Sequence, residues 1–206
     1  MKVAGVGGTG SFGRALARKL RSLGYDVYVG SRDAQRGKER AIELGVEGGS
    51  NEAVVRGADL VVLATKSNAA LDTARELVDA IGETPVLSVV SDVAFTDAGV
   101  LPGRYERSLA EELSEIVRGP VASGLQSLSA AHLAAAELAD EDALVCGDDR
   151  AAKVLALELA GGLVAGRAVD VGPLANSRAL EAMTAVILNV NREYGVTAGL
   201  RLTGLP

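Results

Sequence analysis

Three glycines near the N-terminus have the type and spacing to bind a phosphate group. Gly8, Gly10 and Gly13 form the pattern Gly-x-Gly-x-x-Gly. Between a strand and a helix, the first glycine allows a tight turn and the second allows the backbone to approach a pyrophosphate. The third allows the helix to pack closely on the sheet. N–H groups at the start of that helix then hold the anion. The pattern alone is weak evidence, because glycine-rich turns are common.

The flanking residues supply the required order of strand, turn, helix and strand. Residues 1–6 are an apolar run that leaves no room for an amphipathic helix. Residues 14–23 place apolar side chains three and four positions apart, which is typical of a helix with one buried face. Residues 25–30 form a second β-rich run. We therefore predict a dinucleotide site here, and a structural turn without a ligand is the alternative.

The end of the second strand indicates which dinucleotide is bound. Enzymes that use NAD place Asp or Glu about twenty residues after the glycines, to hold the ribose 2′-hydroxyl. This chain has Ser31 and Arg32 instead, with Arg36 one helical turn further on. Because guanidinium groups donate in a fork that matches phosphate oxygens, these residues favour the 2′-phosphate of NADP. The alternative is that both arginines only solvate a helix start. Asp33 suits the N-terminus of that helix.

Composition excludes several other kinds of site. The chain has 206 residues and a net charge of −6, which argues against nucleic acid or a membrane surface as a partner. One cysteine and one histidine exclude an internal disulfide, a cysteine metal cluster and a multi-histidine metal site, so no metal is expected. We expect Cys146 and His132 to be structural. With no signal peptide or membrane span predicted, a cytoplasmic location is expected.

Alternating strands and helices predict an α/β fold, a Rossmann-type doubly wound parallel sheet with a smaller packed C-terminal α/β domain. The predicted units are residues 1–119, which bind the dinucleotide, and residues 120–206, which bind substrate and form a dimer. Ligands bind beyond the carboxyl ends of parallel strands. The apolar runs at 58–65 and 85–91 therefore bring Ala64, Thr65 and Val90 to the site. Lys66 is either a solvated loop residue or a phosphate-binding or catalytic lysine.

Other segments give weaker patterns. Residues 48–51 predict a turn, and residues 95–105 predict a loop that is a candidate lid. Residues 164–172 and 198–205 are expected to be mostly β. Residues 179–191 predict an apolar helix that is buried or forms a subunit contact.

Three stretches together resemble the F420H2:NADP+ oxidoreductase family. They are residues 6–13 with Gly-Ser-Arg at 30–32, Val-Cys-Gly-Asp-Asp at 145–149, and Asp-Val-Gly-Pro-Leu-Ala-Asn-Ser-Arg at 170–178 with its continuation to 204. The resemblance runs nearly end to end. It implies a Rossmann domain for NADP, a smaller C-terminal domain, the deazaflavin coenzyme F420 in the cleft between them, and a homodimer. The implied reaction is reversible hydride transfer between NADP(H) and F420.

The resemblance also implies site residues. The predicted cofactor-binding residues, from motif and resemblance together, are Gly8, Thr9, Gly10, Ser11, Phe12, Gly13, Ser31, Arg32, Arg36, Ala64, Thr65, Val90 and Ala130. The implied F420 pocket is Gln126, Leu128, Ala182, Thr184 and Ala198. Gln126 and Leu128 stand where some members have a His-x-Ile pair. Ala182 replaces a serine, and Lys66-Ser67 replaces a Pro-Trp pair. These differences concern the second substrate and not NADP.

Direct hydride transfer needs no nucleophile, metal or essential histidine, so no catalytic residue is predicted. The protein would supply stacking geometry and exclude water. Two alternatives remain. One is a related NADPH-dependent reductase of another flavin, an imine or a metal chelate. The other is a non-catalytic NADP-binding sensor.

Overall fold

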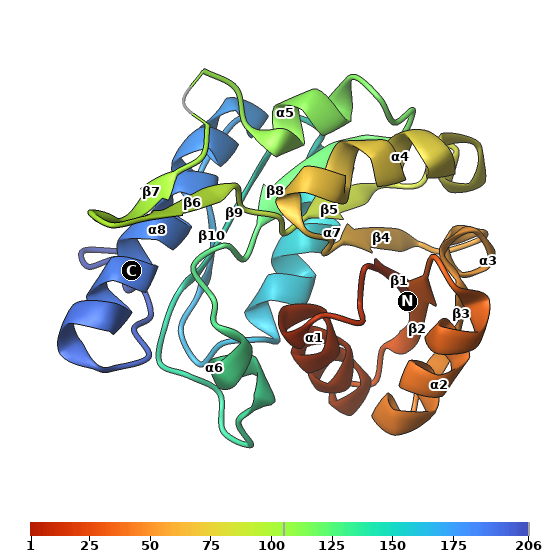
Figure 1. Ribbon diagram of the computed structural model, residues 1–206, viewed down its shortest axis with the longest axis horizontal. Coiled ribbons are helices and arrows are strands. Elements are labelled where there is room, and N and C mark those ends of the chain that lie inside the picture. Colours follow the sequence, from red (N-terminus) through yellow and green to blue (C-terminus); the bar gives the residue numbers. More distant parts are fainter. Residues whose placement is uncertain (105, 206) are drawn as a thin grey trace.

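The computed structural model describes residues 1–104 and 106–205, in which strands and helices alternate from the N-terminus (Figure 1). The first half contains β1 (Lys2–Val6), α1 (Ser11–Ser22), β2 (Asp26–Ser31), α2 (Ala34–Leu44), β3 (Glu47–Ser50), α3 (Asn51–Val55), β4 (Leu60–Leu63), α4 (Ser67–Ile81), β5 (Val86–Ser88), β6 (Val93–Thr96) and β7 (Gly99–Pro102). The second half contains α5 (Leu109–Ser114), β8 (Val121–Gly124), α6 (Ala130–Ala134), β9 (Ala143–Gly147), α7 (Arg150–Gly161), β10 (Ala168–Asp170), the 3₁₀ helix η1 (Leu174–Asn176) and α8 (Ser177–Tyr194).

The central sheet has eight strands in the order β10-β9-β8-β5-β4-β1-β2-β3. The chain starts in the middle of the sheet at β1, winds outward to β3, and then crosses back to β4 and winds the other way. This confirms the predicted Rossmann-type doubly wound α/β fold. The order reverses between β1 and β4, and in sheets of this type ligands bind at such a reversal, beyond the strands' carboxyl ends. The described strands of this sheet pair in parallel except β8 with β9, which pair antiparallel in the part of the chain after residue 119.

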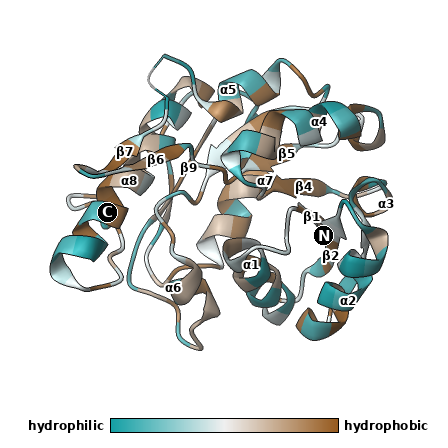
Figure 2. Ribbon diagram, viewed as in Figure 1, coloured by the Kyte–Doolittle hydropathy of each residue, from teal (hydrophilic) through white to brown (hydrophobic). Residues whose placement is uncertain are grey.

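Helices cover both faces of this sheet. On one face, α1 and α7 bury Leu16, Leu20 and Leu159 in an aliphatic core. On the other face, α3, α4 and α5 bury a second core that includes Leu77 and Leu113. The coloured ribbon shows apolar strands between helices with polar outer surfaces (Figure 2). This arrangement explains why β4 is apolar at every position, since neither of its faces meets water.

The predicted boundary between residues 119 and 120 separates two strands that are neighbours in this sheet. β5, before the boundary, pairs in parallel with β8, after it, through Val86–Val121 and Ser88–Ser123. The C-terminal strands therefore extend the dinucleotide-binding sheet instead of forming a sheet of their own. The β6–β7 hairpin and α8 lie together at one end of the molecule, away from the glycine turn (Figure 1). The division into units 1–119 and 120–206 stays a prediction.

The loop predicted at 95–105 is wrong over most of its length. Residues 93–102 form the antiparallel hairpin β6–β7, while Tyr105 lies outside the described residues. The hairpin is held by α8, because the Asn189 side chain accepts from Val100 N at 2.9 Å and donates to Val100 O at 2.7 Å. Its turn ends at Gly99, where φ is +121°. A pairing with a residue 89 positions away leaves no local pattern.

Three other boundaries differ from the sequence predictions. The turn predicted at 48–51 is mostly the edge strand β3, where a Cβ at Gly48 would lie 2.5 Å from the Cβ of Ala41 on α2. The predicted strand at 164–172 is reduced to Ala168–Asp170. The described residues of 198–205 form no strand. This segment is instead held by Asp142, whose N–H donates to Leu200 O and whose carboxylate accepts from Leu202 N.

Candidate active site

The glycine turn lies between β1 and α1, at the point where the strand order reverses. Gly7 has a φ of +77°, so the left-handed turn residue is Gly7 and not Gly8 as the motif predicts. A Cβ at Gly7 would also lie 2.8 Å from Thr65, which shows how closely the ends of β1 and β4 approach. A Cβ at Gly8 would lie 3.1 Å from Val29. Gly7 therefore makes the turn, and Gly8 lets the turn lie against β2.

Gly13 and Gly10 are required by different neighbours. A Cβ at Gly13 would lie 2.6 Å from Gly8 Cα, so this glycine allows α1 to pack on the turn, as predicted. A Cβ at Gly10 would meet, among the described residues, Gly7 O alone, at 3.9 Å. Gly10 is also the N-cap residue of α1, and because it is a glycine, no capping side chain accepts from the first N–H groups of the helix. The space above Gly10 and the N–H groups of the first turn therefore fit a pyrophosphate.

The tip of β2 presents a hydroxyl and two guanidiniums. Ser31 ends the strand, and Arg32 and Arg36 are exposed beside it. Within the described part of the chain, neither arginine has an ion-pair partner. Asp33 is turned into α2, where its carboxylate accepts from Gln35 N at 2.9 Å and Arg36 N at 3.2 Å. This confirms the capping role predicted for Asp33, and it leaves the guanidiniums to meet a phosphate.

A pocket of about 210 Å³ opens beyond the ends of β4, β5 and β8. It brings together predicted residues from both parts of the chain, namely Phe12, Ala64, Thr65, Val90, Gln126, Leu128 and Thr184. The first four were predicted beside NADP and the last three beside F420. None of these seven side chains carries a charge, which suits the stacking of two flat rings.

Polar contacts fix the wall of this pocket that α8 contributes. Thr184 Oγ1 lies 2.6 Å from Ser91 Oγ and donates to Gln126 O at 3.0 Å. The Gln126 side-chain amide donates to Ser123 Oγ at 2.8 Å and to Ser88 O at 3.3 Å. Two buried oxygens of the lining residues, Gln126 Oε1 and Thr65 Oγ1, have no hydrogen-bond partner among the described residues. Polar groups on a bound ring would satisfy them, so the residues fit such a ligand.

Sequence reasoning missed part of the lining. Val89 and Leu125 also line the pocket. Leu125 is fully buried and has a φ of +72°, which a branched side chain rarely adopts. Backbone strain of this kind is held in place by the surrounding fold and concentrates at functional sites. The residue type gave no signal for it, because leucine in an apolar run predicts only a core position.

The structure places three predicted site residues away from this pocket. Ala130 begins α6 and lies with Ser11 along a neighbouring groove. Ala182 is two residues from Thr184 on α8, about 200° around the helix, so the two cannot face the same space. Ala198 follows the end of α8 and donates its N–H to Asn191 Oδ1. Thr9 lies in the turn between Gly8 and Gly10.

Lys66, His132 and Cys146 were the residues with side chains that could react, and each lies in a different environment. Lys66 is exposed at the N-cap position of α4. His132 Nδ1 lies 2.9 Å from Glu141 Oε1, and burial raises the pKa of this glutamate. Cys146 is buried, and burial raises the pKa of its thiol to about 12, so the reactive thiolate is not formed near neutral pH. Lys66, His132 and Cys146 are not among the residues that line the pocket.

Comparison with known proteins gives the family. Residues 2–92 match the family model described as NADP oxidoreductase, coenzyme F420-dependent. The F420-dependent NADP reductase of Methanothermobacter thermautotrophicus is 33% identical, with 100% of this chain and 96% of the relative covered. That of Methanocaldococcus jannaschii is 30% identical, with 100% and 99% covered.

Solved structures agree with this assignment. A crystal structure from Arthrobacter sp. FB24, of a protein proposed to be an F420-dependent NADP reductase, has a TM-score of 0.84 and 25% identity. The match covers 98% of this chain and 99% of that one. An imine reductase from Streptomyces aurantiacus has a TM-score of 0.65 and 19% identity, over 95% of this chain and 62% of that one, and is similar in fold alone. From its glycine turn to its C-terminal segment, the chain belongs to the family of F420-dependent NADP reductases.

Proposed function

We propose that this protein transfers a hydride reversibly between NADP(H) and coenzyme F420. The observation that carries the proposal is the pocket that joins the two parts of the chain. Phe12 and Ala64, beside the glycine turn, face the same space as Leu128 and Thr184. A nicotinamide held from the turn would meet a second ring held against β8 and α8. When bound, the two coenzymes supply the reactivity, which is hydride transfer between nicotinamide and deazaflavin.

The protein's part in this reaction is binding, alignment and exclusion of water. The first turn of α1 and Gly10 hold the pyrophosphate, and Ser31, Arg32 and Arg36 hold the 2′-phosphate. The branched side chains of Val89, Val90 and Leu128 exclude water from the ring contact. The network of Thr184, Ser91 and Gln126 fixes the opposite wall. In this arrangement the rate enhancement comes from holding the two rings in contact and not from a proton-transfer residue.

The experiment is an assay of F420-dependent NADP+ reduction with the purified protein. Reduced F420 and NADP+ should give NADPH and oxidised F420, both of which are followed by absorbance. The same mixture with NAD+ should react much more slowly. A protein that binds NADPH with micromolar affinity and leaves F420 unchanged in both directions would contradict the proposal. That result would favour a sensor or a reductase of another acceptor.

A homodimer in the cytoplasm is part of the proposal. The hairpin, α8 and the residues just after α8 expose large apolar side chains that the described chain does not cover, namely Phe95, Leu101, Val186, Tyr194 and Val196. A surface of this kind is typical of a protein–protein contact, and a second copy of the chain is the partner we propose. The buried, unpaired thiol of Cys146 suits a reducing compartment. No described helix is both long and apolar enough to cross a membrane.

A further inference from the structure

Glu181 is a buried acidic residue that the proposed function does not use. It lies on α8, one helical turn before Thr184, and it is 4% exposed. Its carboxylate accepts from two backbone N–H groups at the start of α5, through Oε2 from Leu109 at 3.0 Å and through Oε1 from Ala110 at 3.1 Å. Burying a charge is costly unless partners of this kind are present. Glu181 therefore joins α8 to α5.

The groups around Glu181 bring its pKa close to neutral pH. Burial raises this pKa to about 7, the two N–H groups and the charge of Arg104 act to lower it, and the charge of Asp92 acts to raise it. The thiol of Cys146 on β9 also interacts electrostatically with Glu181. The 3₁₀ helix η1 has no titratable side chain. The other charged side chains near this contact are bound to partners of their own, namely Arg107, Glu111, Glu112 and Arg178.

The protonation state of Glu181 decides how many hydrogen bonds it accepts from α5. An ionised carboxylate accepts at both oxygens, as it does in the structure. A neutral carboxyl group carries a proton on one oxygen, so it accepts well from one N–H only, and its O–H needs an acceptor of its own. Because both states are populated near pH 7, the contact between α8 and α5 changes near neutral pH.

The helix carries this change to the pocket. Glu181 and Thr184 are three residues apart, which is about 4.5 Å along the axis of α8. Thr184 Oγ1 donates to Gln126 O at 3.0 Å and lies 2.6 Å from Ser91 Oγ, and all three residues line the pocket. Hydrogen bonds weaken when their atoms are displaced or misaligned. A shift of α8 at Glu181 therefore moves the wall of the pocket that Thr184 forms.

We propose that Glu181 is a positioning residue, which in its ionised form docks α8 on α5 and holds Thr184 at the wall of the pocket for hydride transfer. This inference rests on the proposed function, which has the two rings meet in that pocket. Glu181 itself does not line the pocket. Its effect is therefore on the alignment of the rings, which changes kcat, and not on the groups that hold the phosphates of NADP+.

The first test is the pH profile of kcat for F420-dependent NADP+ reduction, between about pH 5.5 and pH 8.5. In the wild type, kcat should rise on the order of tenfold as pH passes through about 7. Glu181→Gln presents an NH₂ group to one of the two N–H donors, so it should keep the low kcat at every pH, with the KM for NADP+ unchanged. Ionisation of the substrates affects both proteins alike. A wild-type kcat that does not change near pH 7 would overturn the inference.

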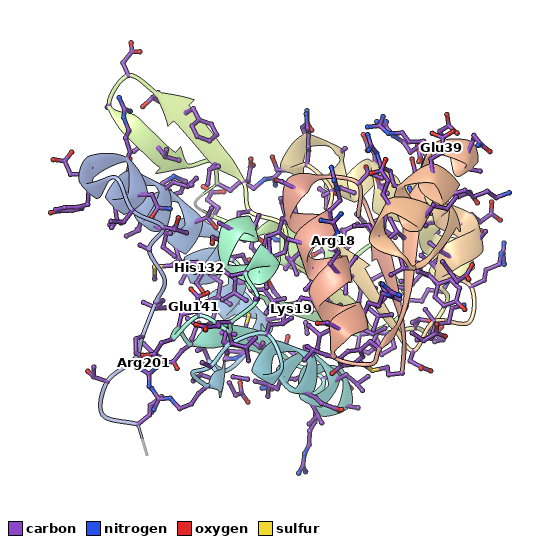
Figure 3. All side chains as sticks on the ribbon, turned by 90° about the horizontal axis from the view of Figure 1, so that it is seen from below. Arg18, Lys19, Glu39, His132, Glu141 and Arg201 are labelled. Atoms are coloured by element: carbon purple, nitrogen blue, oxygen red, sulfur yellow. The ribbon has the colours of Figure 1, made fainter. Side chains whose placement is uncertain are left out.

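Glu141→Gln is the matched control. Glu141 is 3% exposed, and burial raises its pKa as well. Its carboxylate, however, lies beside His132 of α6 (Figure 3), and the residue does not line the pocket. This variant should keep the rise of kcat near pH 7. Loss of the rise in both variants would mean that the contact of Glu181 with α5 is not its cause, and the inference would be wrong.

Two further variants test the assignment without changing Glu181. Burial, the main cause of its raised pKa, is the same in both. Asp92→Asn removes a negative charge, so the rise of kcat should move to lower pH. Arg104→Gln removes a positive charge, so the rise should move to higher pH. Because Arg104 Nε lies 2.9 Å from Asp92 Oδ2, each substitution also frees the opposite charge, which adds to the same shift. Shifts in one direction for both variants would mean that another group titrates.

Amide NMR separates this inference from the proposed function. In the wild type, the signals of Leu109, Ala110 and Thr184 should titrate together with a midpoint near pH 7, and in Glu181→Gln none of them should. If Thr184 does not respond while Leu109 and Ala110 titrate, the ionisation does not reach the pocket and the inference is overturned. If all three titrate but the protein does not reduce NADP+ with F420 at any pH, the link between Glu181 and the pocket stands and the proposed function alone is wrong.

Discussion

Gly10 and Gly13 belong to one motif, but they are glycines for different reasons. Gly10 leaves space for a ligand, while Gly13 lets α1 pack on the turn. At Gly10 an added Cβ would have room within the protein, and φ is −74°, which any residue adopts. At Gly13 the same atom would lie 2.6 Å from Gly8 Cα. We expect Gly10→Ala to change the free energy of unfolding by less than about 1 kcal/mol while weakening NADP binding at least tenfold.

The matched substitution Gly13→Ala should destabilise the fold by about 1–3 kcal/mol, because α1 must move away from the turn. Urea unfolding measures the stabilities, and titration calorimetry with NADPH measures the affinities. If Gly10→Ala unfolded as readily as Gly13→Ala, the packing argument for the second glycine would be wrong. If it bound NADPH like the wild type, the backbone would not approach a pyrophosphate there.

Arg32 and Arg36 give a second prediction at the scale of single residues. Both are exposed and lack ion-pair partners in the described structure, so their substitution should leave the fold intact. Hydrogen bonds to charged groups contribute about 1.5–3 kcal/mol. The double variant Arg32→Gln/Arg36→Gln should therefore raise the KM for NADP+ roughly 10- to 100-fold and leave that for NAD+ nearly unchanged.

Arg40→Gln is the control for this prediction. Arg40 lies on the same helix, α2, but its guanidinium is bound to Glu43 at 2.8 Å. The control should leave both KM values unchanged. Equal effects on NADP+ and NAD+ in the double variant would mean that the arginines do not contact the 2′-phosphate.

At the scale of elements, α8 and α5 are joined by a buried carboxylate. Glu181 is 4% exposed and accepts from Leu109 N at 3.0 Å and Ala110 N at 3.1 Å, at the start of α5. Burial raises its pKa to about 7, although the two N–H groups act to lower it. The ordinary pKa of a glutamate is about 4.3. The folded protein therefore binds a proton more tightly than the unfolded chain between about pH 4.5 and pH 7.

The difference between the folded and unfolded pKa of Glu181 decides how stability changes with pH. The contribution of Glu181 to stability is greatest below about pH 4.5 and falls as pH rises to about 7, by on the order of 1–3 kcal/mol. Glu181→Gln should remove that slope. Urea unfolding at several pH values between 4.5 and 8 gives the comparison. Identical slopes in the variant and the wild type would contradict the assignment.

Other carboxylates also change the stability with pH, but their effects can be distinguished from that of Glu181. The pKa of Glu141 is also raised by burial, but this residue contributes equally to both proteins, so the difference between them isolates Glu181. Hydrogen bonds from Arg178 and Arg167 lower the pKa of Glu111 and Asp142, respectively, to about 2. The stability from these two carboxylates is present above about pH 4.5 and is lost as pH falls towards 2. Their window does not overlap that of Glu181.

Elements with a local signature could be predicted from the sequence. The glycine spacing at 8–13, the apolar run of β4 and the cap at Asp33 each leave a pattern within a few residues of sequence, and the structure has all three. The alternation of such elements was enough to give the doubly wound sheet. The ends of its strands then brought Ala64, Thr65 and Val90 to one pocket.

Features that depend on distant partners could not be predicted in this way. The conformation of Leu125 is held by β9, where Leu144 O accepts its N–H at 3.2 Å. The β6–β7 hairpin depends on Asn189 of α8. Family resemblance put Ala182 and Thr184 together, but helix geometry directs them to different sides and leaves Thr184 in the pocket. Long-range pairing and the rotation of a helix decided these details.

At the scale of the whole molecule, the two ends differ in what they leave exposed. The glycine-turn end exposes arginines, while the end formed by the hairpin and α8 exposes apolar side chains. Phe95 is 77% exposed and Tyr194 is 73% exposed. Each Å² of apolar surface that is buried contributes about 25 cal/mol to the free energy of association. These side chains are therefore the strongest source of association energy on this face. The proposed dimer would cover these side chains, and the pocket of each copy would be lined by residues of that copy alone.

The double variant Phe95→Ser/Tyr194→Ser should therefore turn a dimer into a monomer. Sedimentation velocity at micromolar concentrations measures the mass in solution. The control is Ile42→Ser, which removes an apolar side chain that is 79% exposed on α2, far from this face. It should leave the mass unchanged. A wild-type monomer at assay concentrations would contradict the proposed homodimer. A dimer that survives in the double variant would mean that the copies meet elsewhere, and the hairpin face would then need another partner.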